Sequence, residues 1–470
     1  MKIALPKGRL LPGTAALLER ADWGLSSYQE GMRSYRLTSL RFPDLFAKVF
    51  HEKDIPVQVA VGNYDLGICG LDWVEELLVK YPSSALVKIR KLGYGEGALY
   101  VVAARGGVVS DPEEIQGREE LIRLASEYPN LAESFALERR LRRFSVFPLW
   151  GAAEAYPPDS ADLALISGGV NEESFNHGLV PVSDVLAFSA VIIANKDSWE
   201  TKDLSRVLAS LDGGLPGVEK RSMPVAAGRE RTPGAYPAPQ EVTDDAVRLA
   251  LPDGHQQSPT VKLLNKAGMK IDDYPSATGN RRPSPAMEGV TAKVIRPQDM
   301  PLQVANGNFD LAITGKDWLT EHLYQFPSSP VTELLDLKFG WVKIVAVVCN
   351  DLPVTEVAEL KSVFAGRGMP IRVASEYINI ADKCARDNHL GRYRVVPTWG
   401  ATEAFLPEDA DLLIENTETG GTIARHNLKI IDTMFESTAR LIGNRDSVSS
   451  PAKRQRIKSI TEILRKAVED

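Results

Sequence analysis

The sequence predicts an α/β protein made of two tandem copies of one unit, and three observations carry this prediction. Residues 51–76 and 296–321 are identical at 14 of 26 aligned positions, and further matched pairs follow in the same order along the chain. The offset between matched residues stays between 245 and 249, which indicates a duplication of one large unit rather than a short-period array. Short apolar runs alternate with helical patterns in both copies, which is typical of mainly parallel sheets covered by helices on both faces.

The expected strands are the apolar runs, and the expected helices stand between them. Strands are predicted at 2–6, 65–70 and 99–104 in the first copy and at 248–252, 310–315 and 342–349 in the second. Helices are predicted at 12–21 and 300–307. Each copy is large for a single sheet, so we expect two lobes with a ligand cleft between them.

The domain boundaries follow from the repeat and from one change in composition. The first copy is predicted at residues 1–211 and the second at residues 246–470. Between them, residues 212–245 contain five prolines and five glycines and lack periodic apolar residues. This composition favours an extended, semi-stiff linker over a packed element.

Composition excludes several classes of protein. The chain has 470 residues, of which 44% are hydrophobic, so it is not mainly disordered. Its net charge of -7 argues against general binding to nucleic acid or to an anionic membrane. The sequence has no apolar stretch long enough to span a membrane and no recognisable targeting segment at its start. Three cysteines and no metal-spaced histidines argue against disulfides and against a protein-held metal, so we expect a cytoplasmic protein.

The most informative segment lies near the end of the second copy. An expected strand at 411–416 contains Glu415, and a turn of Thr419, Gly420, Gly421 and Thr422 leads into a helical pattern. Backbone N–H groups at a helix start, glycines that permit close approach and hydroxyl donors together favour a phosphate ligand. A tight connecting turn with a threonine cap is the alternative. Glu415 could accept hydrogen bonds from ribose hydroxyls or could equally be a solvated carboxylate.

The first copy lacks this arrangement. It has Val170, Asn171, Glu172 and Glu173 at the positions of the turn, and two carboxylates would repel a phosphate at close range. We therefore expect only the second copy to bind a phosphorylated substrate there.

The opening turn differs in the opposite sense. The first copy has Lys7 and Arg9 around a glycine, which suits a polyphosphate, although a solvent-exposed basic turn is the alternative. The second copy has Asp253-Gly254-His255 at the same place. Either Lys7 or Arg9 reaches the second copy's site, or both persist in the first copy's own cleft.

These motifs, taken together, resemble those of ATP phosphoribosyltransferases. The resemblance rests on LPKGRL (5–10), RPQDMPLQVANGNFDLAITGKDW (296–318) and ETGGT (418–422), and it covers both copies. It implies units of two α/β lobes similar to type II periplasmic binding proteins. It also implies a glycosyltransferase that joins N1 of ATP to C1 of 5-phosphoribosyl-1-pyrophosphate, with substrate-bound Mg²⁺, in the first step of histidine biosynthesis.

The resemblance also implies roles for particular residues and partners. Glu415 and Arg296 would be catalytic, and the turn 419–422 would bind the ribosyl donor. ATP or polyphosphate would be bound by Lys7, Arg9, Arg282, Thr314, Gly315, Asp317, Tyr377 and Glu403. The two copies would form an internal pseudo-dimer, and a regulatory subunit related to histidyl-tRNA synthetase or a further homo-oligomer is possible. The alternatives are a non-catalytic sensor on the same fold and a phosphoribosyltransferase for another base.

Overall fold

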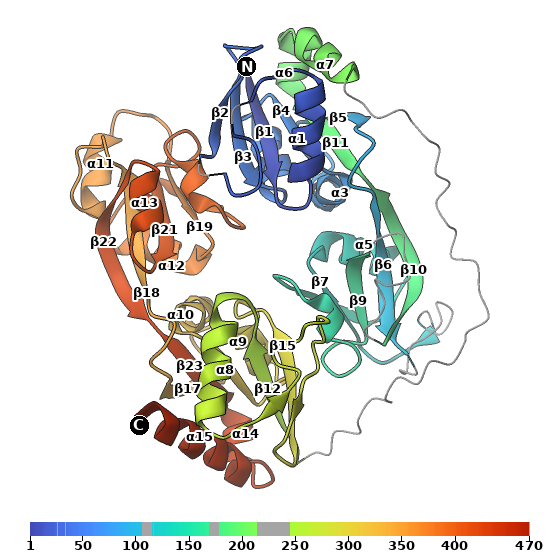
Figure 1. Ribbon diagram of the computed structural model, residues 1–470, viewed down its shortest axis with the longest axis vertical. Helices are drawn as coiled ribbons and strands as arrows, with labels where there is room; N and C mark the ends of the chain where they lie inside the picture. Colours follow the sequence, from blue (N-terminus) through green and yellow to red (C-terminus); the bar gives the residue numbers. More distant parts are fainter. Residues whose placement is uncertain are drawn as a thin grey trace. The chain divides into compact units, whose positions relative to one another are not determined.

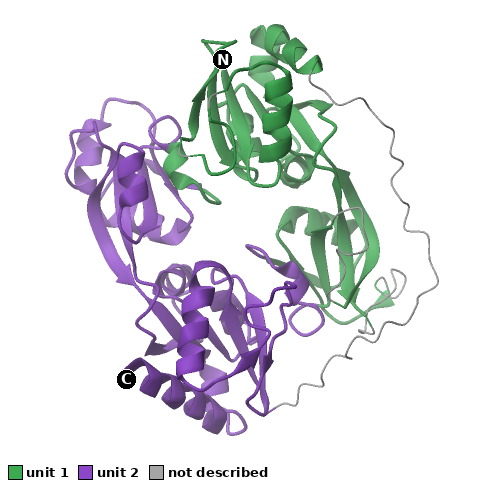
Figure 2. Ribbon diagram, viewed as in Figure 1, with its two compact units in different colours: residues 1–148, 162–235, 398–405 green, residues 149–161, 236–397, 406–470 purple. Residues whose placement is uncertain are grey.

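The computed structural model describes residues 1–25, 27–32, 34–105, 115, 117–168, 178–213 and 245–469. Within these ranges the chain forms two compact units, coloured separately in Figure 2. Unit 1 draws on residues 1–148, 162–235 and 398–405, and unit 2 draws on residues 149–161, 236–397 and 406–470. All but the ends of the expected linker, residues 214–244, lies outside the described residues.

Unit 1 contains two sheets and the helices that cover them (Figure 1). The first sheet has the order β2 (Arg36–Thr38), β3 (Phe46–His51), β1 (Lys2–Lys7), β4 (Leu66–Gly70), β11 (Ala190–Asn195) and β5 (Leu86–Lys91). The second has the order β10 (Leu179–Phe188), β6 (Gly97–Ala104), β9 (Leu163–Gly168), β7 (Ile122–Ser126) and β8 (Phe144–Pro148). The helices are α1 (Leu11–Arg20), α2 (Asp54–Ala60), α3 (Leu71–Lys80), α5 (Pro129–Glu138), α6 (Lys196–Thr201) and α7 (Ser205–Asp212).

Unit 2 repeats this plan. Its first sheet has the order β15 (Val290–Ile295), β12 (Val247–Pro252), β16 (Leu311–Gly315), β23 (Ala439–Asn444) and β17 (Val331–Asp336), beside a small pair, β13 (Ile271–Asp272) and β14 (Ser284–Pro285). Its second sheet has the order β20 (Tyr393–Pro397), β19 (Ile371–Ser375), β21 (Leu412–Thr417), β18 (Val342–Cys349) and β22 (Leu428–Ser437). The helices are α8 (Gln257–Lys266), α9 (Met300–Ala305), α10 (Lys316–Gln325), α11 (Leu360–Val363), α12 (Ile378–Asp387), α13 (Gly421–Arg425), α14 (Arg445–Ser449) and α15 (Arg454–Glu469).

The α/β fold class and the two lobes of each copy are confirmed, but the sheets are mixed rather than mainly parallel. In unit 1, β1 pairs in parallel with β3 and β4, whereas β11 is antiparallel to both β4 and β5. Unit 2 has the same pattern around β23. The reason is the chain path: β11 and β23 return from the second sheet of their unit, so they enter the first sheet in the opposite direction.

Apolar periodicity explains the elements that were expected. All five residues of β4 and of β16 are buried, which fits continuous apolar runs in strands covered on both faces. In α15 the buried residues Ile457, Ile460 and Leu464 recur at three- and four-residue spacing, so one face of this helix packs on the core. No helix among the described residues is long and apolar enough to cross a membrane.

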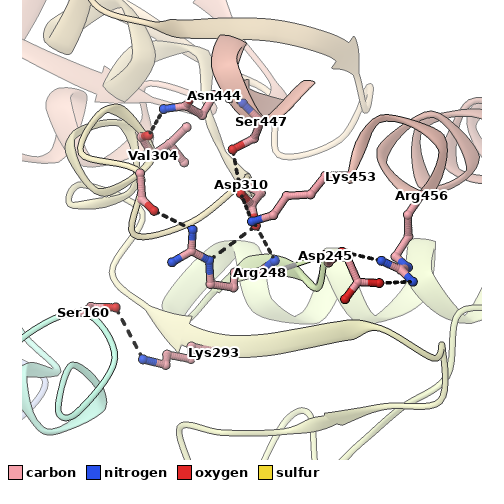
Figure 3. A network of polar contacts seen from close by, with 11 residues as sticks. Ser160, Asp245, Arg248, Lys293, Val304, Asp310, Asn444, Ser447, Lys453 and Arg456 are labelled. Carbon is pink, nitrogen blue, oxygen red and sulfur yellow. Dashed lines mark hydrogen bonds and ion pairs between the residues drawn. The ribbon is translucent and has the colours of Figure 1, made fainter. Parts of the chain in front are cut away.

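A buried carboxylate fixes the C-terminal helices to the first sheet of unit 2 (Figure 3). Asp310 is fully buried and accepts hydrogen bonds from Ser447 Oγ at 2.6 Å and Lys453 Nζ at 2.9 Å. It also accepts the backbone N–H of Arg248 at 2.8 Å. Burial alone would raise the pKa of Asp310, but these hydrogen bonds outweigh burial and hold it below its ordinary value.

Two short segments are exchanged between the copies. Residues 149–161 belong to the first copy by sequence but are part of unit 2, and residues 398–405 of the second copy are part of unit 1. The segment 149–161 contains the short helix η1 (Ala153–Ala155), which contacts β15. Each compact unit therefore includes a piece of the other copy, which the repeat pattern alone did not indicate.

Candidate functional site

The predicted phosphate turn joins β21 to α13 in unit 2. Gly420 has a φ of +74°, a left-handed conformation that favours glycine, and its N–H donates to Thr417 Oγ1 at 2.9 Å. Gly421 N–H donates to Thr419 Oγ1 at 3.4 Å. The turn thus has the expected strand–turn–helix geometry, with Glu415 half-buried on β21 just before it.

The helix after the turn, α13, has only five residues. α13 ends at Arg425, because Asn427 has a φ of +57° and Leu428 already begins β22. Arg425 also places a cation on the turn that the sequence analysis missed. Its Nη2 donates to Thr422 Oγ1 at 2.9 Å, and its Nε donates to the carbonyl oxygen of Gly421 at 3.2 Å.

Asp317 and Tyr377, both expected to bind ATP, are brought together in the interior of unit 2. Tyr377 donates its hydroxyl to Asp317 Oδ2 at 2.7 Å, and Ser437 Oγ donates to Oδ1 at 2.9 Å. Asn416 Nδ2 donates to the Tyr377 hydroxyl at 2.8 Å. Burial raises the pKa of Asp317, and the hydrogen bonds offset this only in part.

The neighbouring predicted residues are buried as well. Thr314 donates its hydroxyl to the carbonyl oxygen of Pro297 at 2.8 Å. Gly315 is the N-cap of α10, and a Cβ there would collide with the carboxylate of Asp317. In this structure these groups join the two lobes of unit 2, since Asp317 lies on α10 and Tyr377 precedes α12.

Aromatic side chains reinforce the same contacts between lobes. Trp318 lies 4.4 Å from Tyr377, measured between ring centroids, and Trp150 lies 5.6 Å from Trp318. In unit 1, Trp73 stacks on Tyr128 at 4.2 Å. These rings pack the lobes together.

A second cluster of charged groups lies at the opening turn of the second copy. Asp253 Oδ2 is 2.9 Å from Arg281 Nη1 and 3.3 Å from Arg296 Nη1. Glu154 from the exchanged segment is 3.1 Å from Arg281 Nε. Arg296 keeps 41% of its side chain exposed, so its guanidinium can still meet a ligand.

Arg282 is also held by the exchanged segment. Its Nη1 lies 2.7 Å from Asp159 Oδ2, and its Nη2 donates to the carbonyl oxygens of Ala155 and Pro157. The same carboxylate pairs with the buried Lys293 at 2.7 Å. The structure thus places the predicted ATP-binding Arg282 in contact with the first copy's segment.

The predicted basic residues of the first copy make contacts inside unit 1. Arg9 pairs with Glu52 at 2.9 Å and with Asp72 at 3.1 Å, and Lys7 Nζ donates to the Tyr35 hydroxyl at 3.3 Å. Asp72 is fully buried. Arg9 therefore serves as the counter-ion of two carboxylates of its own copy.

The remaining predicted residues lie in other parts of the chain. Glu403 lies in η5 (Thr402–Phe405), which belongs to unit 1, so it is not part of the unit that holds the phosphate turn. Val170, Asn171, Glu172 and Glu173 lie outside the described residues.

A cavity of about 490 Å³ lies elsewhere in unit 2, between α9 and the end of α10. His322 lines it, and its Nε2 lies 2.7 Å from Ser329 Oγ. Burial lowers the pKa of His322 to about 4. The lining of this cavity contains none of the residues predicted to bind substrate.

A family model for ATP phosphoribosyltransferase matches the chain twice, at residues 51–213 and 296–466. The chain belongs to the ATP phosphoribosyltransferase family. The matched ranges contain Arg296, Asp317 and the turn 419–422, whereas both opening turns lie before them. The match confirms the resemblance of the motifs to this family of transferases in histidine biosynthesis.

Individual members of the ATP phosphoribosyltransferase family match one copy's length. The enzyme of Prosthecochloris aestuarii is 33% identical over 222 residues, which cover 47% of this chain and 71% of that protein. The enzyme of Chlorobaculum parvum is 32% identical over 231 residues, or 48% of this chain and 73% of that protein. A solved structure of the ATP phosphoribosyl transferase (HisG:HisZ) complex from Thermotoga maritima aligns at 22% identity with a TM-score of 0.38, over 47% of this chain and 98% of that chain.

The resemblance to ATP phosphoribosyltransferases implies magnesium carried by the substrates. Among the described residues, no group of three or more histidine, cysteine, aspartate or glutamate side chains is arranged to hold a metal ion. The carboxylate of Asp253 already pairs with two guanidiniums, so it is poorly suited to bind a metal ion as well. A substrate-bound Mg²⁺ stays a prediction.

Proposed function

We propose that the chain catalyses the ATP phosphoribosyltransferase reaction in its second copy. The bond formed joins N1 of the adenine of ATP to C1 of 5-phosphoribosyl-1-pyrophosphate, and the bond broken releases pyrophosphate. The observation that carries this proposal is the turn 419–422, with its left-handed Gly420 and two threonine hydroxyls, in a chain of this family.

The chemistry suits the residues of unit 2. Displacement at an anomeric carbon passes through an oxocarbenium-like state, so the protein mainly positions two polyanions and stabilises the leaving pyrophosphate. The turn 419–422 would hold the 5-phosphate through the hydroxyls of Thr419 and Thr422, and the N–H groups of Gly420 and Gly421 would have to leave their threonine partners to join them. Arg296, with its partly exposed guanidinium, would bind the pyrophosphate, and Glu415 would accept hydrogen bonds from the ribose hydroxyls.

Substrate-bound magnesium would neutralise phosphate oxygens when the substrates bind. We further propose that one cleft per chain binds the ribosyl donor. A regulatory subunit related to histidyl-tRNA synthetase, and a homo-oligomer beyond the internal pair, remain predictions.

The test is pyrophosphate release by the full chain with ATP, compared with other purine nucleotides. Thr422→Glu should remove turnover, because a carboxylate in the turn replaces a donor with a repelling charge that costs about 2–5 kcal/mol, or roughly 30-fold or more in rate. Glu418→Gln, which changes an exposed charge beside the turn, is the matched control and should stay active.

The outcomes separate the alternatives. Release with another purine nucleotide but not with ATP would indicate a phosphoribosyltransferase for a different base. Binding of 5-phosphoribosyl-1-pyrophosphate without any turnover would indicate a sensor. A Thr422→Glu variant with unchanged affinity for the ribosyl donor would show that the turn is not the binding site.

A further inference from the structure

The two copies have different side chains at three equivalent positions, and these side chains differ in charge. Residues 7, 35 and 51 of the first copy correspond to residues 253, 281 and 296 of the second. The backbone confirms the middle pair, because Val49 N–H donates to the carbonyl of residue 35 and Val294 N–H donates to the carbonyl of residue 281. The end of β1 pairs residue 7 with residue 51, and in the second copy residue 253 continues the pairing of β12 with β15.

In the first copy, the triad of residues 7, 35 and 51 carries its positive charge at the opening turn. Lys7 donates to the hydroxyl of Tyr35. Burial, together with the charges of Lys53 and Lys7, lowers the pKa of His51 to about 4, so His51 is neutral at pH 7. The formal charge of the triad is +1, from Lys7 alone.

In the second copy the charges are distributed differently over the three positions. Asp253 stands in place of the lysine, and Arg281 and Arg296 stand in place of the tyrosine and the histidine. Both guanidiniums contact the same oxygen of Asp253. One negative and two positive groups again give a formal charge of +1, but the exposed positive charge is now at Arg296.

The two guanidiniums also disfavour at position 253 the lysine that the first copy has at position 7. A lysine at position 253 would lie beside two guanidiniums, and like charges at such distances repel. Asp253 is 8% exposed, and its Oδ1 is buried without a hydrogen-bond partner among the described residues. Both guanidiniums are thus gathered at Oδ2 of a largely buried carboxylate.

The exchanged segment completes the arrangement from the first copy. Glu154 gives Arg281 a second carboxylate, so Arg281 is fixed between two acids. The backbone of Gly151 lies against Arg296, since a Cβ at Gly151 would come within 2.8 Å of Arg296 Nε. Asp299 accepts the N–H of Trp150 at 3.1 Å, which holds the segment in place.

We propose that Asp253 is a positioning residue that orients Arg296 toward the pyrophosphate group of the substrate, with Arg281 and the first copy's Glu154 as its fixed frame. The second copy has thus replaced the lysine of the opening turn by an acid that directs an arginine. This inference rests on the proposed function for the role of Arg296, and it gives the first copy a part in the second copy's site.

The experiment compares full-length Asp253→Asn, Asp253→Lys and the double variant Asp253→Lys with Arg281→Tyr. The double variant recreates the Lys7–Tyr35 pair of the first copy. Asp272→Asn, which removes an exposed acid from the same lobe, is the matched control. Steady-state kcat and KM for each substrate, binding of inorganic pyrophosphate by calorimetry, and the melting temperature are measured for every variant.

We expect Asp253→Asn to lower kcat about tenfold or more while KM for ATP changes less than about threefold, because Arg296 loses its orienting partner. Asp253→Lys should fall further, and the double variant should regain about tenfold over Asp253→Lys, since the two substitutions are coupled. A merely structural role would move the melting temperature but would not give this recovery. Glu154→Gln should lower kcat less than Asp253→Asn.

Wild-type kcat in Asp253→Asn, or in Asp253→Lys, would overturn the inference. If the wild-type chain itself releases no pyrophosphate, the proposed function fails, but pyrophosphate binding still tests Asp253. Weaker pyrophosphate binding by Asp253→Asn than by Asp272→Asn would then support the positioning role, and equal binding would refute it.

Discussion

The buried carboxylate of Asp310 gives the sharpest prediction about stability. Asp310→Asn keeps the shape of the side chain but removes its negative charge. Lys453 and Arg248 then lose their shared counter-ion inside the first sheet of unit 2. The side chain of Asp310 has no exposed surface, and that of Lys453 is only 14% exposed, so water can replace the lost interaction only in part.

The contacts set the size of the effect. Breaking a buried ion pair by removing one partner costs about 3–5 kcal/mol. The single amide oxygen of asparagine can accept the backbone N–H of Arg248, and its NH2 group can donate to the Ser447 hydroxyl in place of the second carboxylate oxygen. We therefore expect a loss of about 3 kcal/mol, near the lower end of that range. For a unit of this size the loss corresponds to a fall of about 6–12 °C in the melting temperature.

The assay is differential scanning calorimetry, and the first copy supplies its own control. Asp65 there accepts hydrogen bonds from Ser198 and Lys202, but the side chain of Lys202 is 53% exposed. Water can solvate Lys202, so Asp65→Asn should cost only about 1–2 kcal/mol. The pKa of Asp310 is held below its ordinary value, so its contribution is present at neutral pH and is lost as the pH falls below about 4. An Asp65→Asn variant less stable than Asp310→Asn at pH 7 would refute this reasoning.

Two further predictions concern other contacts of the same structure. Glu76 on α3 accepts hydrogen bonds from the backbone N–H groups of Asn130 and Leu131, yet burial raises its pKa to about 7. The folded protein therefore favours the protonated form of Glu76. The stability of the fold should fall as the pH rises from about 4.5 through 7. Glu76→Gln should remove up to about 3 kcal/mol of the change in the free energy of unfolding between about pH 4.5 and 7, and an unchanged pH dependence would contradict this. Gly151→Ala should displace Arg296 and lower kcat about tenfold with little change in melting temperature. Gly366→Ala, where a Cβ meets nothing within 4 Å, is its control, and equal activity of the two variants would contradict the contact.

Local pattern was sufficient for the strands but not for their directions. The apolar runs at 65–70 and 310–315 predict β4 and β16, because strands buried on both faces read as continuous apolar segments. The antiparallel entry of β11 and β23 depends on where the chain returns from the other lobe, which no local pattern contains. The early end of α13 depends on the left-handed conformation of Asn427, which could not be distinguished from a longer helix by periodicity.

In the candidate site, too, the sequence predicts the local features but not the contacts between distant residues. The turn 419–422 could be identified because its residue types act locally, through their own backbone and hydroxyls. In the sequence Asp253 only marks a difference from Lys7, because its partners Arg281 and Arg296 lie far along the chain and only the fold brings them to one oxygen. The buried pairing of Asp317 with Tyr377 is likewise a contact between lobes, and sequence spacing does not reveal it.

The exchange of short segments sets an order on synthesis. Unit 2 contains residues 149–161, which leave the ribosome before the rest of that unit is made. Unit 1 contains residues 398–405, so unit 1 is complete only after most of the second copy has been synthesised. Vectorial folding, in which one domain is finished before the next emerges, is the usual course for multidomain chains. Here neither compact unit is one continuous stretch of chain, so no single cut in the sequence separates unit 1 from unit 2.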